Sequence, residues 1–589
     1  MSLDALRANR SWRLLKAAVQ RRAVFLIPTA ALIGIVAGAV VAATTYSARA
    51  LHRLLFALPE GERLSAQAAL LDPRMALIPA LGGVLVGLSI FFVRRFRSRP
   101  PVDPIEANAL HGGRMSFRES VILAAQTLVS NGFGASVGLE AGYTQISAAV
   151  ASWAGRVLEL RRGDVRILVA SGAAGAVAAA FDAPLTGAFY AFELILGTYT
   201  IAAVAPMMAA ALAATLTANW LGAVQFSITI GEVETLQAAD YVPFLLLGLV
   251  GGGAAILLMR LVTLVDWLYG RTGLRTEFRP LLGGLAVGAM ALVTPQVLSS
   301  GNGALYFDLT AEPALSIIAG VLLLKVMSAA ISLGSGFRGG LFFASLFVGG
   351  LLGTLFSALV AFVAPSVAAG PLETALVGMT AVATGVVGGP LTMTFLALEV
   401  SGDLALAGGV LAAAIVASVL VRETFGYSFS TWRLHLRGET IRSAQDVGWI
   451  RSLTVGSMMR TDVRTVPVDT SIAELKAAFP LGSTSRVVAV DGEGRYAGIV
   501  LLADAYGERE DPEAESQTDI GTLLKFSDEW LSQAMNARTA AGAFQRANAE
   551  ELAVLDRDNR VVGLLTEGFL LRRYAEELEK VRRDLSGER

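Results

Sequence analysis

Long apolar runs separated by short polar segments fill the chain up to about residue 438. The clearest of these runs span residues 23–43, 75–93, 242–259, 313–333 and 404–421. Each is close to the roughly 20 helical residues that cross a hydrocarbon core. The pattern therefore predicts a set of membrane-spanning helices over residues 23–438.

Glycine and proline interrupt this apolar region at several points. The interruptions read PPVDP (100–104), SVGLEAG (136–142), FDAPLTG (181–187), GSGFRGGLFF (334–343) and VVGGPLT (386–392). Backbone that leaves helical geometry inside a membrane is tolerated only where protein or a water-filled cavity surrounds it. Breaks in both halves of the region are typical of transporters with discontinuous helices. Half-helix N-termini offer free N–H groups and a positive dipole end, which favours an anion pathway over a cation pathway.

The sequence becomes polar near residue 440 and alternates short strand-like and helical runs, which predicts an α/β domain. Two segments look like copies of each other, RVVAVDGEGRYAGIVLLADA (486–505) and ELAVLDRDNRVVGLLTEGFL (551–570). Each predicts a strand, a polar turn, a strand and a helix. Acidic residues 507–517 are the expected linker, so we expect one domain over 439–508 and a second over 518–589.

The composition agrees with a chain that is solvated mainly by lipid. Of 589 residues, 54% are hydrophobic and 16% are charged, and the mean hydropathy is +0.58. A soluble protein of this length needs more polar surface. The absence of cysteine excludes disulfides, thiolate catalysis and cysteine-based metal sites.

The placement of cations predicts the topology, although the net charge of −1 is uninformative and gives no support for nucleic-acid binding. Residues 1–22 carry several Arg and Lys residues before an apolar run that is too long for a signal-peptide core. The positive-inside rule predicts a cytoplasmic N-terminal segment over 1–22, and Arg433 and Arg437 place the C-terminal region on the same side. We expect an integral membrane protein of a bacterial inner (plasma) membrane.

Taken in order, the interrupted segments resemble the CLC family of chloride channels and proton-coupled chloride exchangers. SVGLEAG resembles the family segment GREGP, GSGFRGGLFF resembles GSGxxGGxFxP, and FGYSFSTWRLHLRG resembles the last membrane helix. FDAPLTGAFYAFE and GGPLTMTFLALEVSGD resemble two further family segments. The resemblance covers the chain from about residue 20 onward. It implies an all-α membrane domain of inverted repeats and broken helices, arranged as a homodimer with one pathway in each subunit.

The resemblance also implies roles for individual residues. Glu140 falls at the gating glutamate, and Glu193 is a candidate for an inner proton pathway. The positions expected to contact the anion are Pro101, Gly138, Leu139, Gly340, Leu341, Phe342 and Tyr427. Plainer alternatives stay open, namely a helix-start role for Glu140, core packing for Phe342, an interfacial position for Tyr427 and a capping role for Glu193.

Three departures from the family pattern bear on the anion and on coupling. Pro101 stands at a serine position and offers neither a hydroxyl nor a backbone N–H, and relatives with proline there include nitrate-preferring proteins. Leu139 replaces an arginine. Leu194 stands where well-coupled exchangers carry an inner glutamate. Exchange, passive conduction and nitrate preference are therefore all compatible with the resemblance.

The C-terminal copies resemble a pair of CBS domains, which form a cytosolic regulatory module. Adenine nucleotides are common ligands of such pairs and use a hydroxyl residue followed three positions later by an aspartate. The first copy has Asp504 but Leu501, and the second has Thr566 but Phe569. Each site is half built, so a structural or dimer-stabilising module is as good an interpretation as a nucleotide sensor.

Other classes of protein fit the sequence less well. His52, His111 and His435 are widely separated and lack metal-ligand spacing. Ser335 in a GSG segment is only a weak indication of an intramembrane hydrolase. A cation transporter with CBS domains would need several acidic residues at membrane depth, and few are present. We therefore expect neither an enzyme, a metal site nor a resident cofactor, but a carrier of chloride or another small anion, coupled to protons through Glu140. The alternatives are a passive voltage- or pH-gated chloride channel and a nitrate-preferring exchanger.

Overall fold

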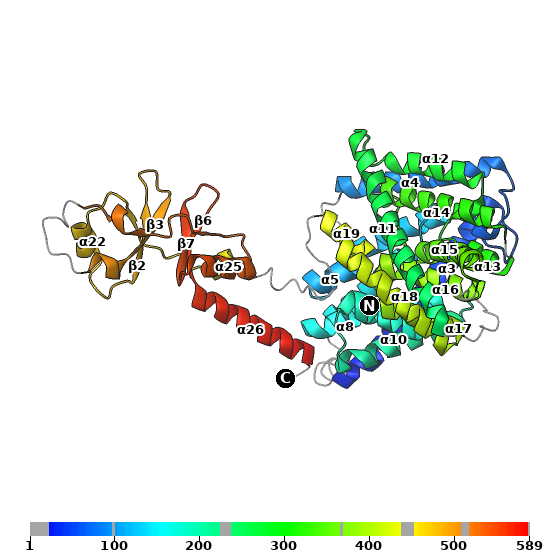
Figure 1. Cartoon of the computed structure of the whole chain (residues 1–589), viewed down its shortest axis with the longest axis horizontal. Helices are drawn as coiled ribbons and strands as arrows, with labels where there is room; N and C mark the ends of the chain where they lie inside the picture. Colours follow the sequence, from blue (N-terminus) through cyan, green and yellow to red (C-terminus); the bar gives the residue numbers. More distant parts are fainter. Residues whose placement is uncertain are drawn as a thin grey trace, which may run out of the picture. The chain divides into compact units, whose positions relative to one another are not determined.

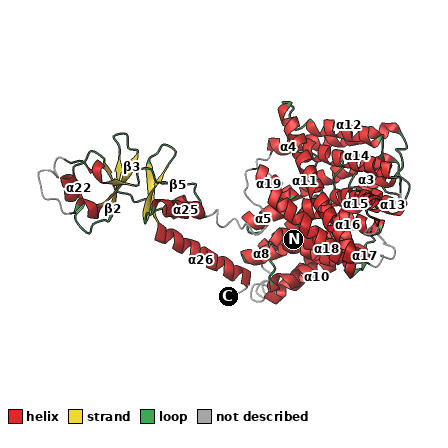
Figure 2. Cartoon of the chain, in the orientation of Figure 1, coloured by secondary structure: helices red, strands yellow, loops and turns green. Residues whose placement is uncertain are grey.

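The computed structural model describes residues 23–96, 101–223, 236, 238–311, 313–365, 369–437, 453–507 and 518–586. The chain divides into two compact units, Met1–Asp446 and Val447–Arg589 (Figure 1). Helices make up the first unit, and the named strands of the described residues belong to the second (Figure 2). The predicted N-terminal segment and linker, 1–22 and 507–517, lie outside the described residues apart from residue 507.

The helices of the first unit agree with the apolar pattern and extend it. Those before residue 221 are α3 (Leu26–Phe56), α4 (Ile78–Phe96), α5 (Pro104–Leu110), α6 (Phe117–Gly132), α7 (Glu140–Val157), α8 (Arg162–Phe181), α9 (Pro184–Tyr190), η4 (Ala191–Leu196) and α10 (Ile201–Trp220). Those after it are α11 (Tyr241–Arg271), α12 (Arg279–Ala291), α13 (Asn302–Ala311), α14 (Leu315–Ser335), α15 (Phe342–Val363), α16 (Pro371–Val387), α17 (Pro390–Ser401), α18 (Leu404–Thr424) and α19 (Phe429–Leu436). Among the described residues, eight helices are long and apolar enough to cross a membrane.

Helix α8 is the most enclosed of these eight. It packs against α3, α7, α9 and α10, and 83% of its most apolar window is buried. Its inner part is a run of alanine and glycine, residues 170–180, interrupted by one serine and one valine. A Cβ atom at Gly172 would lie 2.5 Å from the Ser147 carbonyl oxygen of α7. Small residues here allow the two helix backbones to touch.

Two chain breaks, one in each half of the first unit, lie against each other. One separates α6 from α7 and the other separates α14 from α15. Gly138 and Gly340 are paired across them by two backbone hydrogen bonds, with N–O distances of 3.0 and 3.2 Å. The N-termini of α7 and α15 therefore start from one antiparallel bridge.

The second unit contains the predicted repeat. One sheet has the order β1 (Thr465–Pro467), β2 (Arg486–Val490), β3 (Tyr496–Leu501) and β4 (Leu524–Lys525). The other has the order β5 (Leu531–Ser532), β6 (Glu551–Leu555) and β7 (Val561–Thr566). In both, a short first strand pairs in parallel with the second, and the next pair is an antiparallel hairpin with an irregularity before its turn. The helices of this unit are α21 (Val455–Met458), α22 (Ile472–Ala478), α23 (Leu502–Ala505), α25 (Ala537–Ala547) and α26 (Glu567–Ser586).

Candidate functional site

Glu140 is the first residue of α7 and is almost fully buried, with 7% of its surface exposed. Its Oε1 accepts a hydrogen bond of 2.6 Å from the backbone N–H of Phe343. Phe343 lies in the first turn of α15, so the carboxylate occupies the N-terminal end of a helix from the other half of the chain. The positive end of that helix stabilises an anion at this position. The second oxygen, Oε2, is also buried and receives no hydrogen bond from the described residues.

The glycine bridge leaves room for this carboxylate. A Cβ atom at Gly138 would lie 1.7 Å from Glu140 Oε2, a distance at which the side chain has to move. At Gly340 the corresponding distance is 3.1 Å. Gly138 is therefore required for the observed position of the carboxylate, whereas Gly340 is only in close contact with it.

Glu140 stands between two cavities. One has a volume of about 490 Å³ and is lined by residues that include His52, Leu139, Tyr143 and Phe343. The other has a volume of about 280 Å³. Of the described residues, only Glu140 lines both. Movement of this one side chain would therefore bear on whether the two cavities communicate.

The smaller cavity collects most of the predicted anion contacts. Pro101, Gly340, Leu341 and Phe342 line it, and the Phe342 side chain is buried against Phe181 with ring centroids 4.6 Å apart. The two other glycine-segment positions, Gly138 and Leu139, do not line it. Gly138 acts through the bridge and Leu139 faces the larger cavity.

The charges around the smaller cavity are mainly positive. Arg338, Arg433 and Arg437 line it together with two carboxylates, those of Asp103 and Glu140. The position of Asp103 has a structural explanation, because Asp103 caps α5 by accepting a hydrogen bond of 2.8 Å from the Glu106 N–H. The sequence interpretation missed Arg338, which stands inside the segment GSGFRGGLFF and was visible there.

Tyr427 is not among the residues that line this cavity, which differs from the expectation. Its hydroxyl pairs with His435 Nδ1 at 3.1 Å, and its ring stacks on the same histidine. Phe429 and Ser430, from the first turn of α19, line the cavity instead. The contact of Tyr427 with an anion stays a prediction.

Glu193 caps a helix. Its carboxylate accepts hydrogen bonds from Leu391 N at 3.0 Å, from Thr392 N at 2.8 Å and from Thr392 Oγ1 at 2.6 Å, all at the start of α17. It does not line either cavity, whereas its neighbour Leu194 lines the smaller one. These contacts favour the capping role for Glu193 over a proton pathway.

Glu399 makes the mirror arrangement. Its carboxylate accepts from Leu185 N at 2.7 Å, from Thr186 N at 2.8 Å and from Thr186 Oγ1 at 2.7 Å, at the start of α9. Each glutamate follows a Pro-Leu-Thr start by the same spacing, in PLTGAFYAFE and PLTMTFLALE. The repeated spacing was a usable signal, and each copy caps the other.

The two candidate nucleotide contacts of the second unit are engaged within the protein. Asp504 forms an ion pair of 2.7 Å with Lys525 Nζ, and Thr566 Oγ1 accepts a hydrogen bond of 3.3 Å from Phe569 N. A nucleotide at Asp504 would have to compete with Lys525. Nucleotide binding stays a prediction.

Comparison with known proteins decides the family. The family model described as voltage gated chloride channel matches residues 82–422. The chain belongs to this family. A CBS domain model matches residues 455–509 of the same chain, and the predicted fold class is thereby confirmed.

Curated relatives of this chloride channel family member include ClcB proteins. The voltage-gated ClC-type chloride channel ClcB of Salmonella typhimurium is 31% identical over 397 residues, which are 67% of this chain and 95% of ClcB. ClcB of Escherichia coli O157:H7 is 31% identical over 402 residues, 67% of this chain and 94% of the relative. The matched family is one of channels and transporters, and the match lies within the first unit.

Solved structures share the fold at lower identity. A slow cyanobacterial Cl⁻/H⁺ antiporter matches with a TM-score of 0.61 and 22% identity, over 70% of this chain and 97% of the antiporter. A eukaryotic CLC transporter matches with a TM-score of 0.57 and 18% identity, over 94% of this chain and 98% of the other.

Proposed function

We propose that this chain exchanges chloride, or another small anion, for protons across a membrane, with Glu140 as both gate and proton carrier. The observation that carries the proposal is the position of Glu140 between two cavities, bound to the N-terminus of α15 by one oxygen. The antiporter named among the similar structures moves Cl⁻ and H⁺, which adds support from the fold alone.

The chemistry of the carboxylate supplies a mechanism. Deprotonated Glu140 is itself an anion and occupies the N–H groups and helix dipole that would otherwise attract a small anion. Protonation removes its charge and weakens the bond to the Phe343 N–H. The side chain then leaves, an anion takes its place, and the proton is delivered on the side to which the side chain has moved.

Passive conduction is the second candidate, and Leu194 favours it. This aliphatic side chain lines the smaller cavity at the position where well-coupled exchangers carry a glutamate, so it cannot carry a proton there. Under this alternative Glu140 still moves, but its proton is not exchanged against the anion. Nitrate in place of chloride is supported by Pro101, which lines the same cavity without an N–H or hydroxyl.

The membrane location, the topology and the assembly of the transport domain are part of the same proposal. The eight apolar helices and the bacterial relatives support an inner-membrane location. The arginines at the chain end of the first unit support cytoplasmic termini by the positive-inside rule. A homodimer follows from the family resemblance, and the CBS unit is a candidate regulator of transport.

The deciding experiment reconstitutes the purified full chain in liposomes and records anion flux and internal pH together, with chloride and nitrate compared. Uphill proton movement driven by an anion gradient is the expected result. Anion flux without linked proton movement would overturn exchange in favour of a channel, and the ratio of the two anions reports the preference.

A further inference from the structure

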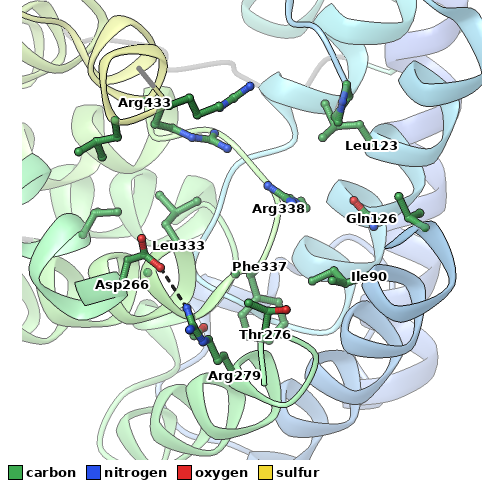
Figure 3. Close-up of a pocket in the computed structure, with 18 of the residues that line it drawn as sticks. Ile90, Leu123, Gln126, Asp266, Thr276, Arg279, Leu333, Phe337, Arg338 and Arg433 are labelled. Atoms are coloured by element: carbon green, nitrogen blue, oxygen red, sulfur yellow. Dashed lines mark hydrogen bonds and ion pairs between the residues drawn. The ribbon is translucent and has the colours of Figure 1, made fainter. Parts of the chain in front are cut away.

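A cavity of about 700 Å³ adjoins the smaller cavity beside Glu140 (Figure 3). The two cavities share six lining residues, among them Arg338 and Arg433. The charged residues that line the 700 Å³ cavity are Arg94, Arg279, Arg338, Arg433, Arg437, Glu119 and Asp266. Five guanidinium groups and two carboxylates line this space, and an excess of positive charge along a cavity attracts anions.

Three of these arginines are already neutralised by neighbours. The ion pairs join Arg279 to Asp266 at 3.4 Å, Arg94 to Glu277 at 3.2 Å and Arg437 to Glu106 at 3.6 Å. Arg338 and Arg433 differ from them. In the part of the chain that the structure describes, no carboxylate oxygen lies within 4.0 Å of either guanidinium group.

These two arginines converge from separate elements. Arg338 belongs to the break before α15, and the Ser130 hydroxyl fixes its backbone N–H at 3.1 Å. Arg433 is on α19. In Figure 3 both side chains extend toward the same space, whereas Arg279 turns to Asp266. Arg338 and Arg433 are close enough to repel each other electrostatically, whereas Asp103 and Asp266 attract Arg433 from beyond ion-pair distance. An anion bound between the two arginines would relieve their repulsion.

Arg338 also carries an unsatisfied donor. Its Nε–H is buried and donates to no acceptor of the described residues. Buried polar groups in proteins nearly always have a hydrogen-bond partner, and the exceptions call for an explanation. An unsatisfied donor on a buried cation that lines a cavity points to a ligand with acceptor oxygens.

We propose that Arg338 and Arg433 bind a phosphate-type oxyanion in this cavity. A guanidinium group presents parallel N–H donors that match two oxygens of one phosphate, a geometry that a single spherical chloride cannot satisfy. The space also far exceeds that of one water molecule, about 30 Å³. The phosphate group could belong to a free ion or to a lipid headgroup. Because the 700 Å³ cavity adjoins the smaller cavity at Glu140, an oxyanion bound there obstructs the passage of transported anions from that side. This obstruction rests on the proposed transport function, whereas the binding of the oxyanion does not.

The test is calorimetric titration of the detergent-purified full chain with inorganic phosphate and, separately, with short-chain phosphatidic acid. Arg338→Gln and Arg433→Gln are each expected to weaken binding at least about tenfold. Arg94→Gln is the matched control, because it removes one positive charge from the same cavity where Glu277 already neutralises it. It is expected to change the affinity less than about twofold.

Lysine variants keep the test valid if the glutamine variants misfold. Arg338→Lys and Arg433→Lys retain the charge but lose the planar fork, and each is expected to weaken binding by several-fold. Phosphate binding with this variant pattern supports a free oxyanion, and the same pattern with phosphatidic acid alone supports a headgroup. No binding of either probe, or equal weakening by Arg94→Gln, overturns the proposal. Chloride flux from the same preparation separates the two claims, since flux without phosphate binding leaves the proposed transport function intact.

Discussion

Among the described residues of the membrane unit, the buried Glu140 and the partly buried Glu193 and Glu399 each place a carboxylate on the N-terminus of another helix. Glu193 and Glu399 each accept three hydrogen bonds, from two backbone N–H groups and one threonine hydroxyl. Glu140 accepts one from Phe343, has a second oxygen that receives no hydrogen bond from the residues the structure describes, and borders two cavities. Under the proposed function, the same physical attraction therefore serves as a permanent cap at Glu193 and Glu399 and as a releasable contact at Glu140.

The difference lies in what replaces the carboxylate when it leaves. At Glu193 and Glu399 the N–H groups would be left unsatisfied among packed side chains, which costs about 1–3 kcal/mol for each group. At Glu140 the adjoining cavities can admit an anion to the same N–H group. We infer that the number of donors and the adjoining space, more than burial, separate a moving carboxylate from a fixed one.

The largest expected effect is that of Glu140→Gln on proton coupling. Glutamine keeps the size of the side chain but cannot carry a proton, so proton movement driven by an anion gradient should be abolished. The measurement is internal pH together with anion flux in liposomes. Glu399→Gln is the matched control and should retain coupling. Proton movement that survives in Glu140→Gln, or that disappears in Glu399→Gln, would contradict the assignment of Glu140 as the proton carrier and Glu399 as a fixed cap.

The next largest effect concerns stability. Glu193→Ala and Glu399→Ala each leave two backbone N–H groups without their acceptor, and each should lower the free energy of unfolding by about 2–6 kcal/mol. Thermal unfolding in detergent checks this, and the mirror geometry predicts similar losses for the two variants. A stable Glu193→Ala protein that has lost proton coupling would instead assign Glu193 to a proton pathway.

A smaller effect is expected from the glycines of the bridge. Gly138→Ala places a methyl group where the Glu140 carboxylate lies, so the side chain should be displaced and anion flux should rise by roughly several-fold at neutral pH. Gly340→Ala, with more room, should change the flux less. The ranking is checked in the same liposome assay. Flux that is equally altered by both variants would show that the bridge itself, and not the carboxylate, was disturbed.

The smallest expected effect is that of Pro101→Ser. Serine adds a hydroxyl and a backbone N–H to the smaller cavity, each a donor worth about 1 kcal/mol to an anion. We expect the ratio of chloride to nitrate flux to rise by about five-fold or less. An unchanged ratio would remove Pro101 from the determinants of anion preference.

The existence of the long helices could be predicted from the sequence, because apolar runs of membrane length have few other uses. Their ends could not. The run at 23–43 is the beginning of α3, which continues to Phe56 past Arg49, His52 and Arg53. Polar side chains line a cavity along that continuation, so a loss of hydrophobicity did not mark the end of the helix.

The candidate site was predictable only where a local sequence pattern marks it. The glycines on either side of Glu140 predicted a break in a helix at this point of the chain, and the structure has α7 begin at Glu140. The partners of a buried charge were not predictable, because Phe343, Thr392 and Leu185 reach their glutamates from about 200 residues away. The contact of Tyr427 with an anion stays a prediction, although its hydroxyl pairs with His435 and it does not line the smaller cavity.

The composition of helix α8 bears on how the membrane unit is inserted into the bilayer during synthesis. It is the least hydropathic of the eight candidate spans, and most of its surface faces protein. A segment of alanine and glycine gains little by leaving the translocation channel for lipid on its own. We therefore expect α8 to enter the bilayer together with its neighbours α7 and α10 during synthesis. A nascent chain that stops before α10 should then leave α8 accessible to water-borne labelling reagents, although the completed protein encloses it.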